Sequence, residues 1–305
     1  MSTAPPAFSA PLGGHPSPPL ERPELPDGVT PTPVGPRWRA WTAWVALVAG
    51  FAGAIAGAIA LAIVAAAFGA SLDSPPPSVN ILGTVIQDLC LVGAAVFMAR
   101  LGGRPRPWDF GLRPTRLWPA VGWGLAVWVS FFLFTAAWVA LLGLKSTDDT
   151  LPRSLGVDRS DIALISVAVL VCVVAPICEE FFFRGYFFTA LRSWKGIWPA
   201  AVITGLVFGA IHAGSADPAF LVPLAFFGFM LCMLYVRTGS LYPGVAVHAL
   251  NNCTVFGVSQ HWNFGEIALA VVCAYALIAA IFLLIRALSP PPPALAALPA
   301  ARAAI

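Results

Sequence analysis

Eight long apolar stretches alternate with short polar connections along most of this chain. A helix that crosses the hydrocarbon core of a bilayer needs about 20 mostly apolar residues. Strands are a poor alternative, because an open sheet in lipid would leave backbone groups without hydrogen-bond partners. We therefore predict an all-α polytopic membrane protein, a bundle of about eight transmembrane helices. The predicted spans are 39–69, 78–100, 118–143, 162–190, 197–213, 218–236, 241–258 and 264–286.

The two ends of the chain differ in composition from these stretches. Residues 1–36 are rich in proline and polar side chains and contain no apolar run, which predicts a disordered cytoplasmic tail. Residues 289–305 are rich in proline and alanine and predict a second loose tail. The transmembrane domain is therefore expected to cover residues 37–288.

Composition indicates that lipid is the main solvent of the chain. Hydrophobic residues make up 59% of the sequence and charged residues only 10%, whereas soluble domains carry about 25% charged residues. The net charge of +3 is small and no basic patch with interleaved aromatic residues is present, so nucleic acid is not an expected partner. Membrane lipid is the expected partner, and no oligomeric state follows from these patterns.

Lysine and arginine gather in alternate connections between the predicted spans. The cytoplasmic loops of membrane proteins carry an excess of these residues. This bias predicts a multi-pass protein of the cell membrane with both termini in the cytoplasm. The basic residues of these connections include Arg104, Arg106, Arg113, Arg116, Arg192, Lys195 and Arg237.

Three ionisable residues stand inside the fourth predicted span: Glu179, Glu180 and Arg184. A charged residue at the centre of a spanning helix costs about 2.5–3.5 kcal/mol, so such residues are functional candidates by default. Glu180 and Arg184 are four apart and share a helix face, which predicts a supporting ion pair. Glu179 lies about 140° from Arg184 around the helix axis and is predicted to be the chemical carboxylate. Pro176, just upstream, is expected to kink the helix and open space beside Glu179.

Two later spans add further polar side chains. The fifth contains His212, and the seventh contains His248 and Asn252, which are four apart on one helix face. Together with Glu179 these residues supply the groups that activate water and stabilise an oxyanion. The alternative is a buried polar network that stabilises the bundle without chemistry. Asp88, in the second span, is a weaker candidate that belongs either to a network or to a helix end.

The order and spacing of these residues resemble those of the type II CAAX prenyl endopeptidase family, also called the CPBP or Abi family of intramembrane proteases. The resemblance covers about residues 80–286. It implies a core of about eight spans and hydrolysis of a peptide bond in a membrane-associated or lipidated peptide or protein. The motifs that carry it are Glu179-Glu180-x-x-x-Arg184, Phe208-x-x-x-His212 and His248-x-x-x-Asn252.

The resemblance also implies roles for the catalytic residues. Glu179 and His212 would activate the attacking water, and His248 and Asn252 would stabilise the oxyanion. Glu180, with its arginine partner, would support the site.

The sequence is compatible with a metal-dependent or a metal-free mechanism, and with functions other than catalysis. Glu179, His212 and His248 are candidate ligands of a divalent metal such as zinc, as in an intramembrane metalloprotease, because two histidines and a glutamate suit that ion. A mechanism that uses the glutamate alone is the other reading. A non-catalytic membrane adaptor or a bacteriocin self-immunity protein is the alternative to an enzyme. A transporter is less favoured, since no internal repeat is visible.

Overall fold

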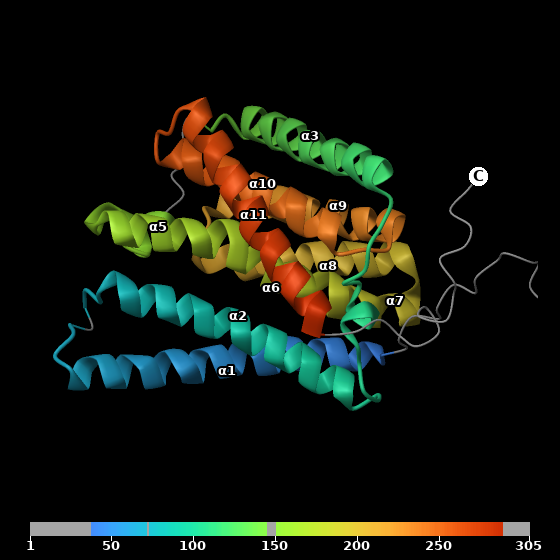
Figure 1. Cartoon of the computed structure of the whole chain (residues 1–305), viewed down its shortest axis with the longest axis horizontal. Coiled ribbons are helices and arrows are strands. Elements are labelled where there is room, and N and C mark those ends of the chain that lie inside the picture. Colours follow the sequence, from blue (N-terminus) through green and yellow to red (C-terminus); the bar gives the residue numbers. More distant parts are fainter. Residues whose placement is uncertain (1–37, 72, 145–150, 289–305) are drawn as a thin grey trace, which may run out of the picture. The chain divides into compact units, whose positions relative to one another are not determined.

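The computed structural model describes residues 38–71, 73–144 and 151–288 (Figure 1). Throughout these ranges the regular elements are helices, and no strand occurs among them. The predicted all-α membrane fold is therefore confirmed. The two predicted tails, 1–36 and 289–305, lie outside the described residues.

The long helices follow the predicted apolar stretches closely. They are α1 (Ala40–Ala67), α2 (Pro77–Arg100), α3 (Leu117–Leu142), α8 (Ile197–Ile211), α9 (Leu221–Thr238), α10 (Tyr242–Ser259) and α11 (Phe264–Leu288). The fourth stretch contains α5 (Asp161–Val169), α6 (Ala175–Glu180) and α7 (Thr189–Lys195), joined without a break by the π-helical segments η3 (Leu170–Val174) and η4 (Phe181–Phe188). Short elements are η1 (Pro107–Phe110), α4 (Leu151–Ser154), η2 (Val157–Arg159), η5 (His212–Gly214) and η6 (Pro218–Phe220).

Seven helical spans in the described part of the chain are long and apolar enough to cross a membrane. The seventh predicted span coincides with α10, which is a helix of 18 residues but is not among the seven spans found. Its polar residues, among them His248 and Asn252, lower its apolar character. Ten residues of α10 are buried inside the protein, so this helix faces other helices and needs less apolar surface.

Glycines allow two pairs of helices to approach closely. In α1, a Cβ atom added at Gly57 would stand 2.5 Å from Ile86 of α2. In α8, a Cβ at Gly205 would stand 2.6 Å from the carbonyl oxygen of Ala225 in α9. Small residues at such spacing permit tight packing of membrane helices. Gly53 in α1 and Gly209 in α8, each four residues from the glycine just described, lie in similarly close contact with α2 and α9.

Five elements of the described bundle pack against α10. Figure 1 shows α3 packed beside α9 and α10, with α11 crossing α10. Segments α6 and η3 contact α10 from the opposite side, and α2 packs against α6. The polar residues of α6, η4, α8 and α10 can therefore meet inside the protein.

Candidate active site

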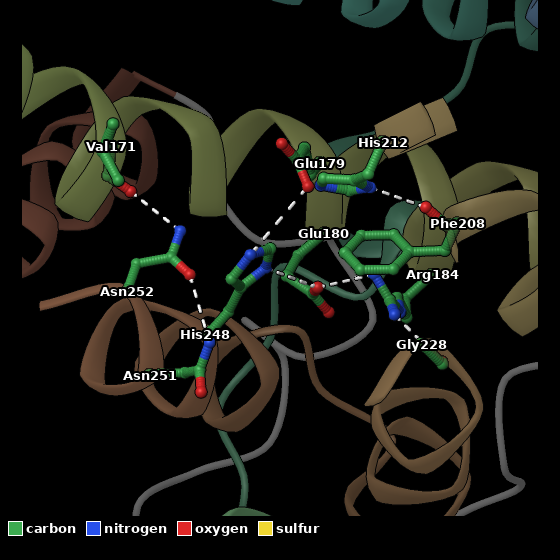
Figure 2. Close-up of polar contacts among 10 residues, drawn as sticks. All are labelled: Val171, Glu179, Glu180, Arg184, Phe208, His212, Gly228, His248, Asn251 and Asn252. Carbon is green, nitrogen blue, oxygen red and sulfur yellow. Dashed lines mark hydrogen bonds and ion pairs between the residues drawn. The ribbon is translucent and has the colours of Figure 1, made fainter. Parts of the chain in front are cut away.

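A buried ion pair forms the base of the site (Figure 2). The Nη1 atom of Arg184 donates to Oε1 of Glu180 at 2.7 Å, and both side chains are 0% exposed. The Nη2 atom of Arg184 donates to the carbonyl oxygen of Gly228 in α9 at 2.9 Å. The guanidinium also lies 4.6 Å from the centre of the Phe208 ring, where a cation is attracted to the ring face. The pair expected from the spacing of four residues is thus present and is tied to α8 and α9.

His248 of α10 lies between the two glutamates, as Figure 2 shows. Its Nδ1 atom is 3.1 Å from Oε1 of Glu180, and its Nε2 atom is 3.9 Å from Oε2 of Glu179. In the ionised pair with Arg184 the carboxylate of Glu180 only accepts hydrogen bonds, so Nδ1 of His248 carries the hydrogen. A carboxylate that holds Nδ1 in this way fixes both the tautomer and the orientation of an imidazole ring. The ring therefore presents Nε2 to Glu179.

Glu179 is the less constrained of the two carboxylates. Its side chain is 16% exposed, while that of Glu180 is 0% exposed. Its Oε2 atom is buried and has no hydrogen-bond partner. A separation of 3.9 Å from Nε2 of His248 is too long for a direct hydrogen bond. Polar atoms at such a distance are suited to sharing a water molecule.

His212 approaches the site from the end of α8. Its Nδ1 atom lies 2.7 Å from the carbonyl oxygen of Phe208 and must donate, because a carbonyl only accepts. The Phe208 ring contacts both histidines, with ring centres 4.9 Å from His212 and 5.8 Å from His248. Figure 2 shows the other ring nitrogen of His212 turned toward Glu179, although no hydrogen bond or ion pair joins these two side chains in the described structure.

Asn252 has a structural partner that its sequence position does not reveal. Its Nδ2 atom donates to the carbonyl oxygen of Val171 in η3 at 2.9 Å. In an α-helix the N–H of Ala175 would bond to the carbonyl oxygen of Val171. Here it bonds to the carbonyl oxygen of Leu170. In a π-helical turn the next donor for Val171 would be residue 176, and Pro176 has no N–H. Asn252 therefore satisfies a carbonyl that the proline leaves without a backbone donor.

This arrangement predicts that two roles of Asn252 can be separated. Asn252→Ala should reduce both stability and cleavage, since it removes the donor to Val171 and the amide beside His248. Adding Pro176→Ala supplies a backbone N–H to η3 and should restore the melting temperature but not the cleavage rate. Thermal melting and cleavage assays on both variants test this. Full recovery of cleavage in the double variant would show that Asn252 acts only through the helix backbone.

Gly244 of α10 leaves the space that Glu180 occupies. A Cβ atom at this position would stand 2.8 Å from Oε2 of Glu180, which no real Cβ contact tolerates without movement. Gly244→Ala is therefore expected to displace Glu180 and release its bond to His248. We expect a fall in turnover of about tenfold or more, as a displacement of about 1 Å can cost 10²-fold. Cleavage by Gly122→Ala, where an added Cβ meets open space, is the matched control and should be unchanged.

The structure does not assemble the predicted metal ligands into a metal site. Among the described residues, no three His, Cys, Asp or Glu side chains lie close enough together to hold an ion. The Nδ1 bonds of His248 and His212 do not by themselves prevent metal binding, since a ligating histidine usually donates its other ring N–H in this way. Glu179 and His248 are neighbours at 3.9 Å, but the three side chains do not form one cluster. In the described arrangement these three side chains are not gathered into a three-ligand zinc centre, and the proposed reaction has no metal step.

Two comparisons with known proteins each match part of this chain. Residues 161–254 match the family model described as type II CAAX prenyl endopeptidase Rce1-like. A segment of 83 residues, 27% of the chain, is 32% identical to the "Putative membrane peptidase YdiL" of Bacillus subtilis strain 168. The match spans a third of the length of that relative. No solved structure matches the chain. Residues 161–254, which contain every side chain drawn in Figure 2, are thus similar to the Rce1-like type II CAAX prenyl endopeptidases.

Proposed function

We propose that this protein is an intramembrane endopeptidase that hydrolyses a peptide bond in a membrane-associated or lipidated peptide or protein. One observation carries the proposal: Glu179 offers a buried oxygen without a hydrogen-bond partner, 3.9 Å from an imidazole nitrogen that a second carboxylate orients. Other buried polar atoms also lack a partner, among them Oε2 of Glu180 and Nε of Arg184. Oε2 of Glu179 differs from these two in facing the Nε2 atom of an oriented imidazole. An open acceptor beside an oriented histidine is the arrangement that holds and activates water.

In the proposed reaction, Glu179 is the general base. Its Oε2 atom takes a proton from water as the water oxygen bonds to the carbonyl carbon of the substrate. The carbonyl electron pair moves to the oxygen and forms an oxyanion. When the carbon–nitrogen bond breaks, the proton held by Glu179 passes to the leaving nitrogen. His212 lies on the Glu179 side of the site and helps to hold the water.

We assign the stabilisation of the oxyanion to His248 and Asn252. Because Nδ1–H of His248 is bound to Glu180, the ring donates to an oxyanion only through Nε2, when both nitrogens carry hydrogens. Asn252 has two N–H groups on Nδ2, and Val171 takes one of them. The other is left for the oxyanion. Removing one such donor typically costs about 10²–10³ in turnover.

The depth of the site supports cleavage within the membrane. Phe208 is eleven residues from the start of α8 at Ile197, which places it about 16 Å along the helix axis. The hydrocarbon core of a bilayer is about 30 Å thick. We infer that the scissile bond lies in the membrane interior, so the substrate must itself enter the bilayer.

Exposed tryptophans support the proposed orientation, with both termini in the cytoplasm. They lie near the starts of α1 and α3 and at the α7–α8 turn, which Figure 1 shows toward the same side of the bundle. Tryptophan is enriched at membrane interfaces, and Lys and Arg are enriched on the cytoplasmic side. The tryptophans are Trp41, Trp44, Trp118, Trp123, Trp194 and Trp198. Exposed basic residues at these ends are Arg39, Arg116 and Lys195, and others stand at the ends of α2 and α9: Arg100, Arg104 and Arg237.

The proposal is tested by comparing membrane peptides in cells that carry the wild type or Glu179→Gln. Mass spectrometry should detect new peptide ends that depend on the wild-type chain and disappear with the variant. Glu266→Gln, the same change at an exposed position at the start of α11, is the matched control and should behave as wild type. A non-catalytic adaptor or self-immunity protein would tolerate Glu179→Gln and give identical peptide sets in all three strains.

A further inference from the structure

A third carboxyl lies inside the bundle, on a helix that the proposed reaction does not use. Asp88 of α2 is only 2% exposed, and its Oδ2 atom is buried without a hydrogen-bond partner. No described cation forms an ion pair with it. Such a group is costly in a membrane protein and marks a functional position by default.

Asp88 faces the proposed active site. Helix α2 packs against α6, which carries Glu179. Asp88 and Glu179 therefore lie on two helices that pack against each other, and each has one buried oxygen, Oδ2 and Oε2, without a hydrogen-bond partner.

A water molecule suits this pair of oxygens. Water has two hydrogens, and a carboxyl oxygen can accept one of them whether or not the carboxyl is protonated. A water that donates to both groups has its lone pairs free to meet a carbonyl carbon. When His248 carries hydrogens on both ring nitrogens it can only donate, so it does not accept the second water hydrogen. Asp88 offers a carboxyl oxygen for that hydrogen, in addition to the contact of His212 with the water.

We propose that Asp88 is a second catalytic carboxyl, which holds the attacking water together with Glu179. This inference rests on the proposed peptidase function. As the water oxygen bonds to the carbonyl carbon, one of its protons passes to Glu179. The other stays on the water oxygen, hydrogen-bonded to Asp88, and leaves on the new carboxylic acid product. Glu179 returns its proton to the leaving nitrogen, so atoms and charge balance over the cycle.

The test exploits opposite effects on stability and turnover. Asp88→Leu replaces an unpaired buried carboxyl by an apolar side chain, a change that is often neutral or stabilising. We expect a melting temperature no lower than wild type, a kcat reduced by about 10²-fold and a KM within about twofold of wild type. Thr84→Val, on the same helix, removes a hydroxyl that bonds only within α2. It is the matched control and should leave kcat unchanged.

Cleavage is measured on the peptide found by the comparison of membrane peptides, with Glu179→Gln in parallel. If Glu179→Gln is inactive and Asp88→Leu cleaves at the wild-type rate, Asp88 is not catalytic and the proposed function stands. If both cleave at the wild-type rate, the proposed function itself fails. A kcat per folded protein that is unchanged beside a lowered melting temperature would make Asp88 structural. Asp88→Asn, nearly identical in shape, takes the place of Asp88→Leu if the leucine variant does not fold.

A second readout needs no substrate. Asp88→Asn and Glu179→Gln each remove one carboxyl of this pair, and the melting temperatures of both singles and the double variant form a cycle. Residues in one network give non-additive effects, whereas distant residues add. We expect the rise in melting temperature of the double variant to be smaller than the sum of the rises in the two single variants. Additive shifts would place the carboxyls too far apart to share a water.

Discussion

Glu179→Gln is expected to remove nearly all cleavage while the protein still folds and inserts into the membrane. The glutamine keeps the size of the side chain but cannot take a proton from water. A positioned general base contributes about 10²–10⁴ to the rate, so kcat should fall by that factor and KM should change little. Purified protein in lipid nanodiscs, assayed with the peptide found in cells, gives both constants.

The expectation is specific to the position of Glu179 in the bundle. Its Oε2 atom is buried and without a hydrogen-bond partner, whereas Oε2 of Glu266 accepts a bond from the backbone of Asn263 in an exposed turn. Glu266→Gln should therefore retain full turnover and the same melting temperature. Cleavage by Glu179→Gln at the rate of this control would rule out Glu179 as the base.

Arg184→Leu is expected to have the largest effect on stability of any single change in the site. It leaves Glu180 as a buried carboxylate without its cation, and the carbonyl of Gly228 loses its donor. Removing one partner of a buried pair costs about 3–5 kcal/mol. We expect little folded protein, or a strongly lowered melting temperature, by thermal denaturation in detergent.

Two further variants show whether the loss of stability comes from the buried pair or would follow the removal of any arginine. Arg153 pairs with Asp158 at 3.7 Å, and these side chains are 76% and 65% exposed. Such surface pairs contribute about 0–1 kcal/mol, so Arg153→Leu should melt close to wild type. Adding Glu180→Gln to Arg184→Leu removes the stranded carboxylate and should recover part of the stability but no cleavage, since His248 then loses its charged partner. Equal melting of Arg184→Leu and Arg153→Leu would contradict a buried pair.

The sequence allows the helices and one ion pair to be predicted, because both depend on local spacing. Apolar stretches of sufficient length become helices in lipid whatever their neighbours are. Glu180 and Arg184 meet because they are four apart on one helix. The polarity of α10 follows from the same sequence, but the burial that compensates for it depends on how the other helices pack.

The rest of the site depends on contacts between distant segments. The bond from Asn252 to Val171 joins residues 81 apart and exists because Pro176 leaves a carbonyl open. The position of His248 between two glutamates requires α10 to cross α6 at one particular height. Asp88 looked peripheral because its helix shares no motif with the others, and only the packing of α2 on α6 brings it to Glu179. No spacing along the chain encodes these distances.

The most direct test is a kinetic cycle on Glu179 and His248, the two side chains proposed to act on one water and the oxyanion it forms. Glu179→Asp and His248→Gln are mild changes that leave measurable turnover, and the double variant completes the cycle. Residues that act as a unit give strongly non-additive losses. We predict that the double variant loses little more kcat than the poorer of the two singles. Losses that multiply, or wild-type turnover in all three variants, would contradict a shared catalytic centre.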